Sequence, residues 1–269
     1  MQAENQALYL MSKVDEIEGK EIIKIYEAMG YTPQSIRNII SKLKKDNYIM
    51  SISRARYKVT KTGKEYIDTH LRRKNFYDYK WDNKWYMVLL EIPETQRKKR
   101  DAFRRSLIHL GFGQLYKSVY VYPWNRTKDV ISIVDTLEIE EYVTILATDE
   151  FILNNIRHEG SNGTNQASEI WDLKAINERY KEMLDLFQAQ IAPEISNLIS
   201  ENSQDYLQLF AYYLQVNDIK SELLEKDPML PPEFLPQNWV GTNVLSTLTN
   251  ASEKIKNLIP SSSVYFPFL

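Results

Sequence analysis

The chain has 269 residues, with 34 lysines and arginines, 36 aspartates and glutamates, and no cysteine. The lack of cysteine excludes disulfides, thiolate metal sites and cysteine nucleophiles, and it fits a reducing cytoplasm. The sequence has no apolar run of about 18 residues, as a membrane span requires, and no basic-then-apolar N-terminus typical of a signal peptide. We therefore expect a cytoplasmic protein of about two or three small domains that does not enter a membrane.

The net charge of −2 hides a separation of charge along the chain. Residues 1–80 hold 16 basic and 10 acidic residues, residues 81–159 hold 11 and 12, and residues 160–269 hold 7 and 14. The basic first part predicts contact with nucleic acid there, because a polyanion attracts clustered cations. The acidic last part would be repelled by DNA, so we expect it to face away from DNA or towards a partner.

Residues 32–45 predict a helix with one apolar face and one face suited to DNA. Thr32 is a suitable N-cap and Pro33 suits the first helical position. Apolar residues recur at helical spacing and form one stripe, namely Ile36, Ile39, Ile40 and Leu43. No carboxylate lies on the opposite face, whereas an ordinary solvated face mixes both signs of charge. This face is formed by Gln34, Arg37, Asn38, Ser41, Lys42 and Lys45.

The flanking segments predict a winged helix-turn-helix over residues 1–74. Helices are expected at about 5–16 and 19–29, and a closing helix from Glu65 to about Arg73. Strands are expected at 48–52 and 57–60, with a basic tip between them. Helices, a two-stranded wing and a closing helix make the winged pattern. The alternative is a small helical domain that docks a protein partner and binds no DNA.

We expect the helix to read the major groove of double-stranded DNA while the wing holds phosphates. Arg37, Asn38, Ser41 and Lys42 would read bases or adjacent phosphates. The complete expected DNA-binding set is Gln34, Ser35, Arg37, Asn38, Ser41, Lys42, Lys44, Lys45, Arg54, Arg56 and Lys58.

Residues 81–158 predict a ferredoxin-like domain of β-α-β-β-α-β order. Two helices cover only one face of such a sheet, whereas the first strand is apolar on both faces, so the second face must also be covered. A second copy of the chain is the simplest candidate for that cover. The expected strands are 85–92, 112–115, 119–122 and 142–148, and the expected helices are 96–110, with Ile108 on its inner side, and 130–137.

Basic residues cluster near the start of the helix expected at 96–110. Cations there oppose the helix dipole, which favours binding of something anionic, either a second DNA contact or a phosphate-bearing effector. The alternative is an ordinary solvated helix face. The cluster consists of Arg97, Lys98, Lys99, Arg100, Arg104 and Arg105.

Residues 168–269 predict a helical C-terminal domain after a turn-rich linker at 159–166. Helices are expected at 168–190, 193–201, 203–226 and 244–258. The proline-rich segment 227–241 cannot be helical, and its apolar residues indicate an ordered loop packed on the helices. Aromatic residues of this part, which we expect to form either core or a ligand pocket, include Trp171, Tyr180, Tyr213 and Trp239.

Several segments, in the right order, resemble the PaaX-type repressors, the family named for control of phenylacetic acid degradation. The resemblance implies an α+β protein with three domains, a homodimer that represses transcription and is released by an aromatic acyl-coenzyme A. No Gly-x-x-x-x-Gly-Lys, Gly-x-Ser-x-Gly or His-Glu-x-x-His motif occurs, so we expect no cofactor and no enzymatic activity. The segments are Ser35–Arg37 with Ser41–Leu43, Lys84–Glu94, Leu110–Gly113, Ile170–Leu173 with Tyr180, Asp227–Pro232 and Leu235–Trp239.

A coenzyme A thioester would need cations for its phosphates and aromatic rings for stacking. We therefore expect an effector site at Arg97, Lys98, Arg100, Arg104, Trp171, Tyr180, Tyr213 and Trp239. The alternative is a purely structural aromatic core, with control by abundance or by a protein partner.

The middle domain also resembles the small ferredoxin-like endonuclease of CRISPR adaptation, through residues 88–93 and 117–119. This resemblance places Glu91 at the position of a metal-ligating aspartate. Two-metal phosphodiester chemistry needs several convergent carboxylates, and a dimer would supply two copies of Glu91 with no evident third ligand. His70, His109 and His158 are scattered without metal-ligand spacing. We therefore expect no metal and no catalytic residue, with a metal-dependent nuclease as the alternative.

Overall fold

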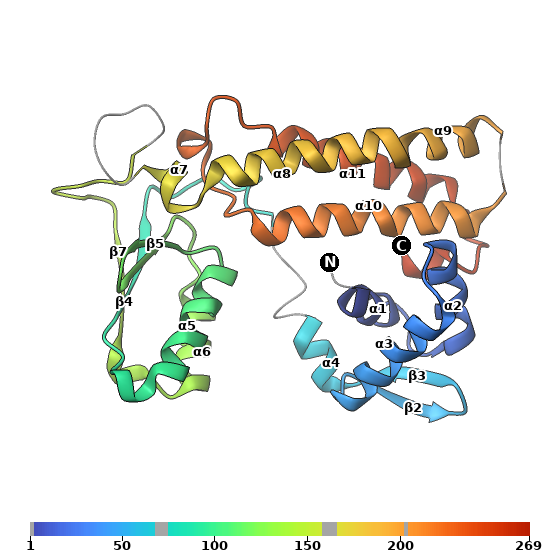
Figure 1. Ribbon diagram of the computed structural model, residues 1–269, viewed down its shortest axis with the longest axis horizontal. Coiled ribbons are helices and arrows are strands. Elements are labelled where there is room, and N and C mark those ends of the chain that lie inside the picture. The colour runs from blue at the N-terminus through green and yellow to red at the C-terminus, as the bar shows by residue number, and fades with distance from the viewer. Residues whose placement is uncertain (1–2, 68–74, 158–165, 202–203) are drawn as a thin grey trace. The chain divides into compact units, whose positions relative to one another are not determined.

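The computed structural model describes residues 3–67, 75–157, 166–201 and 204–269 (Figure 1). The chain divides into two compact units. The first comprises Met1–Lys74, Lys181–Glu222 and Asn243–Leu269, and the second comprises Asn75–Tyr180 and Leu223–Thr242. In the described ranges, no helix has the length and apolar character needed to cross a membrane. The C-terminal segment expected at 168–269 thus contributes residues to both units.

The N-terminal part of the first unit combines helices with a three-stranded antiparallel sheet of order β1-β3-β2. The expected hairpin is present as β2 and β3, whereas the short strand β1, which pairs with β3, was not expected. The closing helix begins at Lys61, earlier than expected, and its expected end lies outside the described residues. The elements are α1 (Ala3–Met11), β1 (Ile17–Glu18), α2 (Gly19–Ala28), α3 (Pro33–Lys45), β2 (Ile49–Ser53), β3 (Arg56–Val59) and α4 (Lys61–Tyr66).

Helix α3 begins and packs as its sequence predicts. The Thr32 side chain accepts a hydrogen bond from the Ser35 backbone N–H at 3.2 Å, which satisfies one of the free donors of the first turn. The apolar side chains Ile36, Ile40 and Leu43 are buried. Helix α3 packs against α1, α2 and β2, so its polar side remains outside.

The helical part of the first unit consists of the end of α8 (Leu173–Leu186), a π-helix (Phe187–Ile191), α9 (Ala192–Ser200), and most of α10 (Tyr206–Lys226) and α11 (Gly241–Leu258). Helix α1 is tied to α10, since the buried Gln6 side chain donates to the Leu214 carbonyl at 3.2 Å. Phe210 stacks on Tyr213 and Tyr265 in this core.

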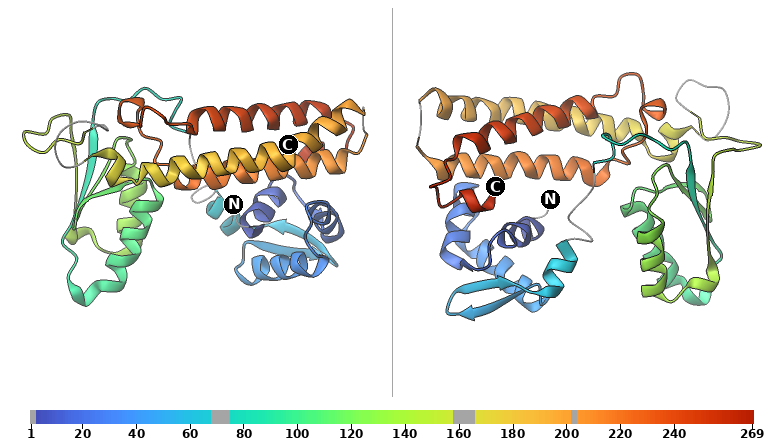
Figure 2. Two further views of the ribbon diagram at one scale, coloured as in Figure 1. Left: turned by 45° about the horizontal axis from the view of Figure 1, so that its top comes forward. Right: turned by 180° about the vertical axis from the view of Figure 1, so that it is seen from behind.

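The second unit contains a four-stranded antiparallel sheet of order β5-β6-β4-β7. Helices α5 and α6 lie together on one side of it (Figures 1 and 2). Phe103, Leu107 and Val130 pack there on Val88 and Leu90. The elements are β4 (Trp85–Leu90), α5 (Arg97–His109), β5 (Gly113–Tyr116), β6 (Val119–Tyr122), α6 (Thr127–Leu137) and β7 (Val143–Thr148), with 3-10 turns at Glu94–Gln96 and Glu140–Tyr142.

The other face of this sheet is covered by the chain itself. Trp85 and Val121 are buried against Leu173 and Leu230, together with residues of α7 (Ala167–Ile170). A second copy was the simplest candidate from the sequence, but this cover comes from the same chain instead. The premise of that expectation was sound, because the apolar second face of β4 needed a partner, and distant segments of the same chain provide one.

The segment from Asp227 to Trp239 is an ordered loop, as predicted. The Asp227 carboxylate is buried and accepts hydrogen bonds from the Tyr77 hydroxyl at 2.8 Å and the Tyr180 hydroxyl at 2.6 Å. It also accepts one from the Met229 backbone N–H at 2.7 Å. The Trp124 ring N–H donates to the Met229 carbonyl at 2.7 Å. Three donors on one carboxylate stabilise its charge, since an unpaired buried carboxylate is costly.

Candidate nucleic-acid interface

The polar face of α3 is exposed along the whole helix. Within this face the Gln34 amide donates to the Asn38 side-chain oxygen at 3.0 Å. A helix whose buried stripe holds it on the domain presents the opposite side chains to solvent, where they can reach a ligand. The exposed polar residues are Gln34, Ser35, Arg37, Asn38, Ser41, Lys42, Lys44 and Lys45.

Three cations of α3 form no ion pair with the described residues. Among the residues that the structure describes, no carboxylate lies within 4 Å of Arg37, Lys44 or Lys45. Lys42 differs, because its Nζ lies 2.6 Å from a carboxylate oxygen of Glu4 on α1. The hydrogen bond to Glu4 raises the pKa of the Lys42 ammonium. The face is thus positive, with one of its cations already paired.

The β2–β3 wing also contains both unpaired and paired cations. Arg54 and Lys58 are exposed, and neither has an ion-pair partner in the described part of the chain. Arg56 is half-buried, with one guanidinium nitrogen 2.9 Å from Glu16 and the other 3.1 Å from Glu18. These carboxylates raise the pKa of Arg56, with the hydrogen bond to Glu18 as the largest cause. Sequence reasoning named Arg56 as a phosphate contact but did not identify these acidic partners.

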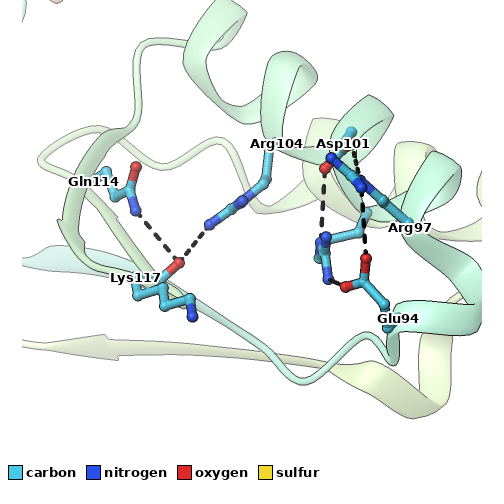
Figure 3. Close-up of polar contacts among 7 residues, drawn as sticks. Glu94, Arg97, Asp101, Arg104, Gln114 and Lys117 are labelled. Carbon is cyan, nitrogen blue, oxygen red and sulfur yellow. Dashed lines mark hydrogen bonds and ion pairs between the residues drawn. The ribbon is translucent and has the colours of Figure 1, made fainter.

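The basic cluster on α5 is largely engaged by its own chain (Figure 3). Glu94 lies 2.7 Å from Arg100 and 3.8 Å from Arg97, and Asp101 lies 3.6 Å from each of these arginines. The hydrogen bond from Arg100 lowers the pKa of Glu94. Arg104 instead donates to a backbone carbonyl, that of Lys117, at 2.7 Å.

Two further cations of this cluster, Lys98 and Arg105, are exposed. Lys99 lies 3.6 Å from a carboxylate oxygen of Glu138. Four cations were expected to bind an effector's phosphates. Of these, Arg97 and Arg100 are paired with carboxylates, and Arg104 donates a hydrogen bond to the Lys117 backbone carbonyl. This leaves Lys98 as the member of that set without a partner among the described residues.

The aromatic residues expected at an effector site pack within the protein. Trp171 donates its ring N–H to the Gly111 carbonyl at 2.9 Å and stacks on Trp85. Tyr180 is buried and binds Asp227, and Trp239 contacts its ring edge-on with centroids 5.6 Å apart. These three rings belong to the second unit.

Tyr213 belongs to the first unit, where it stacks on Phe210. Burial raises the pKa of the Tyr213 hydroxyl. The four aromatic residues therefore take part in two separate cores.

Glu91 is exposed and makes a backbone hydrogen bond to the Tyr142 carbonyl at 2.9 Å. No group of three or more histidine, cysteine, aspartate or glutamate side chains with metal-binding geometry occurs among the described residues. His109 is exposed, while His70 and His158 lie outside those residues.

Comparison with known proteins identifies the family. The family model of the PaaX protein central Cas2-like domain matches residues 78–164, and that of the PaaX-like protein C-terminal domain matches residues 171–261. The chain belongs to the PaaX family. The resemblance inferred from the sequence is thereby confirmed.

Two relatives extend this comparison. The transcriptional repressor PaaX of Escherichia coli (strain K12) is 22% identical over 243 residues, which cover 86% of this chain and 72% of the repressor. The uncharacterized protein Rv0674 from Mycobacterium tuberculosis has a similar structure, with a TM-score of 0.51 and 18% identity, over 90% of this chain and 89% of that one. At this identity the second likeness concerns the fold alone.

Proposed function

We propose that this PaaX-family protein is a transcriptional regulator, acting as a repressor, that binds double-stranded DNA through α3 and the β2–β3 wing. The observation that carries the proposal is the exposed face of α3, where Arg37, Lys44 and Lys45 have no acidic partner among the described residues. Cations held on a rigid helix neutralise DNA phosphates and release counterions. The name of the Escherichia coli relative supports the same function.

We assign the N-terminal part to the winged helix-turn-helix class and the second unit's sheet to the ferredoxin-like class. The first assignment rests on the succession of α2, α3 and the β2–β3 hairpin, with α3 packed on its neighbours by its apolar stripe. The second rests on the β-α-β-β-α-β order with both helices on one face.

Within this interface we assign base reading to Arg37, Asn38 and Ser41, which lie on the exposed side of α3. An arginine can bind a guanine edge with two hydrogen bonds, and an asparagine can do so with adenine. The phosphate contacts are Lys44, Lys45, Arg54 and Lys58. Lys42 and Arg56 also belong to the interface, but each is shared with carboxylates of its own domain.

We further propose that the regulator acts as a homodimer. Each chain offers one reading helix, and two such helices separated by about 34 Å, or a multiple, would match a palindromic operator. Multi-angle light scattering of the full-length protein at micromolar concentration tests this proposal. A monomeric mass both with and without operator DNA would refute it.

Release by an acyl-coenzyme A is the remaining part of the proposed function. An effector releases a repressor from DNA only if it binds more tightly to the conformation that does not bind DNA than to the one that does. Phenylacetyl-coenzyme A and related thioesters should be titrated into the protein–operator complex. If the thioesters neither release the operator nor produce a heat of binding, DNA binding is not regulated by an acyl-coenzyme A.

The main test is selection of DNA from a random duplex pool by the full-length protein, followed by binding at several salt concentrations. We expect an enriched sequence, and an affinity that falls as salt rises with a slope of about −0.9 for each phosphate neutralised. No enrichment together with salt-insensitive binding would favour the protein-docking alternative. Metal-dependent cleavage of the pool would favour the nuclease alternative.

A further inference from the structure

A polar cavity of about 300 Å³, open to solvent and lined by exposed charged side chains, lies in the N-terminal part of the first unit. Its lining comes from the segment after α1, from strand β3 and from the first turns of α4. Three of its side chains are lysines, Lys13, Lys58 and Lys64, and one is an acid, Asp15. Lys58 was expected to hold a DNA phosphate, whereas Lys13 and Lys64 were given no role by the sequence.

The three ammonium groups form no ion pair with a carboxylate in the described part of the chain. No carboxylate of the described residues lies within 4 Å of Lys13, Lys58 or Lys64, and Asp15 forms no ion pair with them. The Lys13 Nζ lies 5.0 Å from the centre of the Tyr9 ring, a contact that orients it without cancelling its charge. Three lysines and one aspartate give the lining a formal charge of +2.

Positive charge in a concave wall attracts small anions more strongly than the same charge on an open surface, because the protein wall focuses the field. Lysine binds phosphate as a compact point charge with three donors. The volume of about 300 Å³ leaves room for a phosphate or a diphosphate group.

We propose that this cavity is a phosphate-binding site formed by Lys13, Lys58 and Lys64. The phosphate group can come from the backbone of bound duplex DNA or from a soluble phosphorylated molecule. The first source rests on the proposed function, whereas the second does not. A soluble phosphate would compete with DNA for Lys58 and would therefore weaken operator binding beyond the effect of ionic strength.

Calorimetric titration of inorganic pyrophosphate into the full-length protein at fixed ionic strength tests the soluble source. The double variant Lys13→Gln/Lys64→Gln should bind at least about tenfold more weakly, equivalent to about 1.4 kcal/mol. The control is Lys24→Gln/Lys61→Gln, which removes two exposed lysines that do not line the cavity. Asp15→Asn removes the negative charge of the lining, so pyrophosphate binding should strengthen severalfold.

The same variants are also measured for binding to duplex DNA. This measurement tests whether the phosphate comes from the DNA backbone. A loss of DNA affinity in Lys13→Gln/Lys64→Gln but not in the control, without saturable pyrophosphate binding, assigns the cavity to the DNA backbone. Loss of pyrophosphate binding alone assigns it to a soluble ligand. If neither measurement separates the cavity variant from the control, the site does not exist. If no variant binds DNA, the proposed function fails while the pyrophosphate result still decides this inference.

Discussion

Two helices of this protein carry dense positive charge, and they differ in what surrounds it. On α3, Arg37, Lys44 and Lys45 face solvent with no acid within ion-pair distance among the described residues. On α5, Arg97 and Arg100 are paired with Glu94 and Asp101. Both helices are rich in lysine and arginine, so basic composition alone does not identify a nucleic-acid interface.

The difference lies in the spacing of acids along each helix. Glu94 precedes Arg97 by three residues, and Asp101 follows it by four, which places both on the same side of the helix. Between Thr32 and Lys45 there is no acid at all. A basic helix is therefore open to a polyanion when its own neighbouring turns do not supply the counter-charge.

The largest expected effect is the replacement of Arg37 by alanine. If Arg37 binds a guanine edge with two hydrogen bonds, its loss costs about 1–3 kcal/mol on the selected operator and relaxes specificity at one base. The matched control on the other helix is Arg105→Ala, which also removes an exposed arginine. Fluorescence anisotropy with labelled operator measures both variants. Equal losses would show that α3 is not the reading helix.

A smaller effect is expected from the lysines that bind phosphates. Lys44→Gln/Lys45→Gln should weaken binding to all sequences alike and reduce the salt slope by about one for each phosphate that is no longer neutralised. Arg97→Gln should leave the slope unchanged, since its charge is already paired with Glu94 and Asp101. The measurement is the affinity for operator and for unrelated duplex over a salt series. If the salt slope changes only in the Arg97 variant, α5 rather than α3 contacts the DNA phosphates.

Removing the acidic partner of a paired cation on α3 should modestly increase the affinity for DNA. Glu4→Gln removes the carboxylate that lies 2.6 Å from Lys42, so we expect DNA affinity to rise about two- to fivefold, the range typical of exposed ion pairs. Glu27→Gln is the control, because it removes the same charge from an exposed position on α2. If both variants tighten binding equally, net charge rather than the Lys42 pair is responsible.

The smallest effect concerns Glu94, whose pKa lies below its ordinary value of 4.5 because Arg100 donates to it. A lowered folded-state pKa means that the pair stabilises the fold above pH 4.5 and that this contribution is lost as the pH falls through the lowered value. Arg100→Gln should return the pKa of Glu94 towards 4.5. Carbon-detected NMR of the glutamate carboxyl groups during acid titration measures the shift. An unchanged pKa would show that Arg100 is not its partner in solution.

Local patterns predicted much of the fold. The cap at Thr32 and the apolar stripe of α3 predicted the bounds of that helix correctly, because both signals lie within one segment. Periodicity was less reliable at ends and kinks. Ile108, expected inside α5, is 53% exposed near the end of that helix. The helix expected from 168 to 190 is interrupted at Asp172, which has a left-handed backbone with φ of 47°.

Long-range contacts were not predictable from the sequence pattern. Glu4 pairs with Lys42 across 38 residues, and Glu16 pairs with Arg56 across 40, so no helical spacing relates them. The cover of the second sheet face likewise comes from Leu173 and Leu230, far from β4. Periodicity showed that this face needed a cover, but it carried no information about which segment supplies it.

The hydrogen bonds of Asp227 have a consequence for the order in which the chain can finish folding during synthesis. Tyr77 and Asp227 are separated by 150 residues, so the second unit is incomplete until the ribosome has passed the proline-rich loop. Strands β4 to β7 can pair earlier, but Trp85 and Val121 lack the cover of Leu230 until then. A nascent chain stalled before residue 227 would thus lack part of this cover, and a fragment cut at 81–158 would lack Leu173 as well as Leu230.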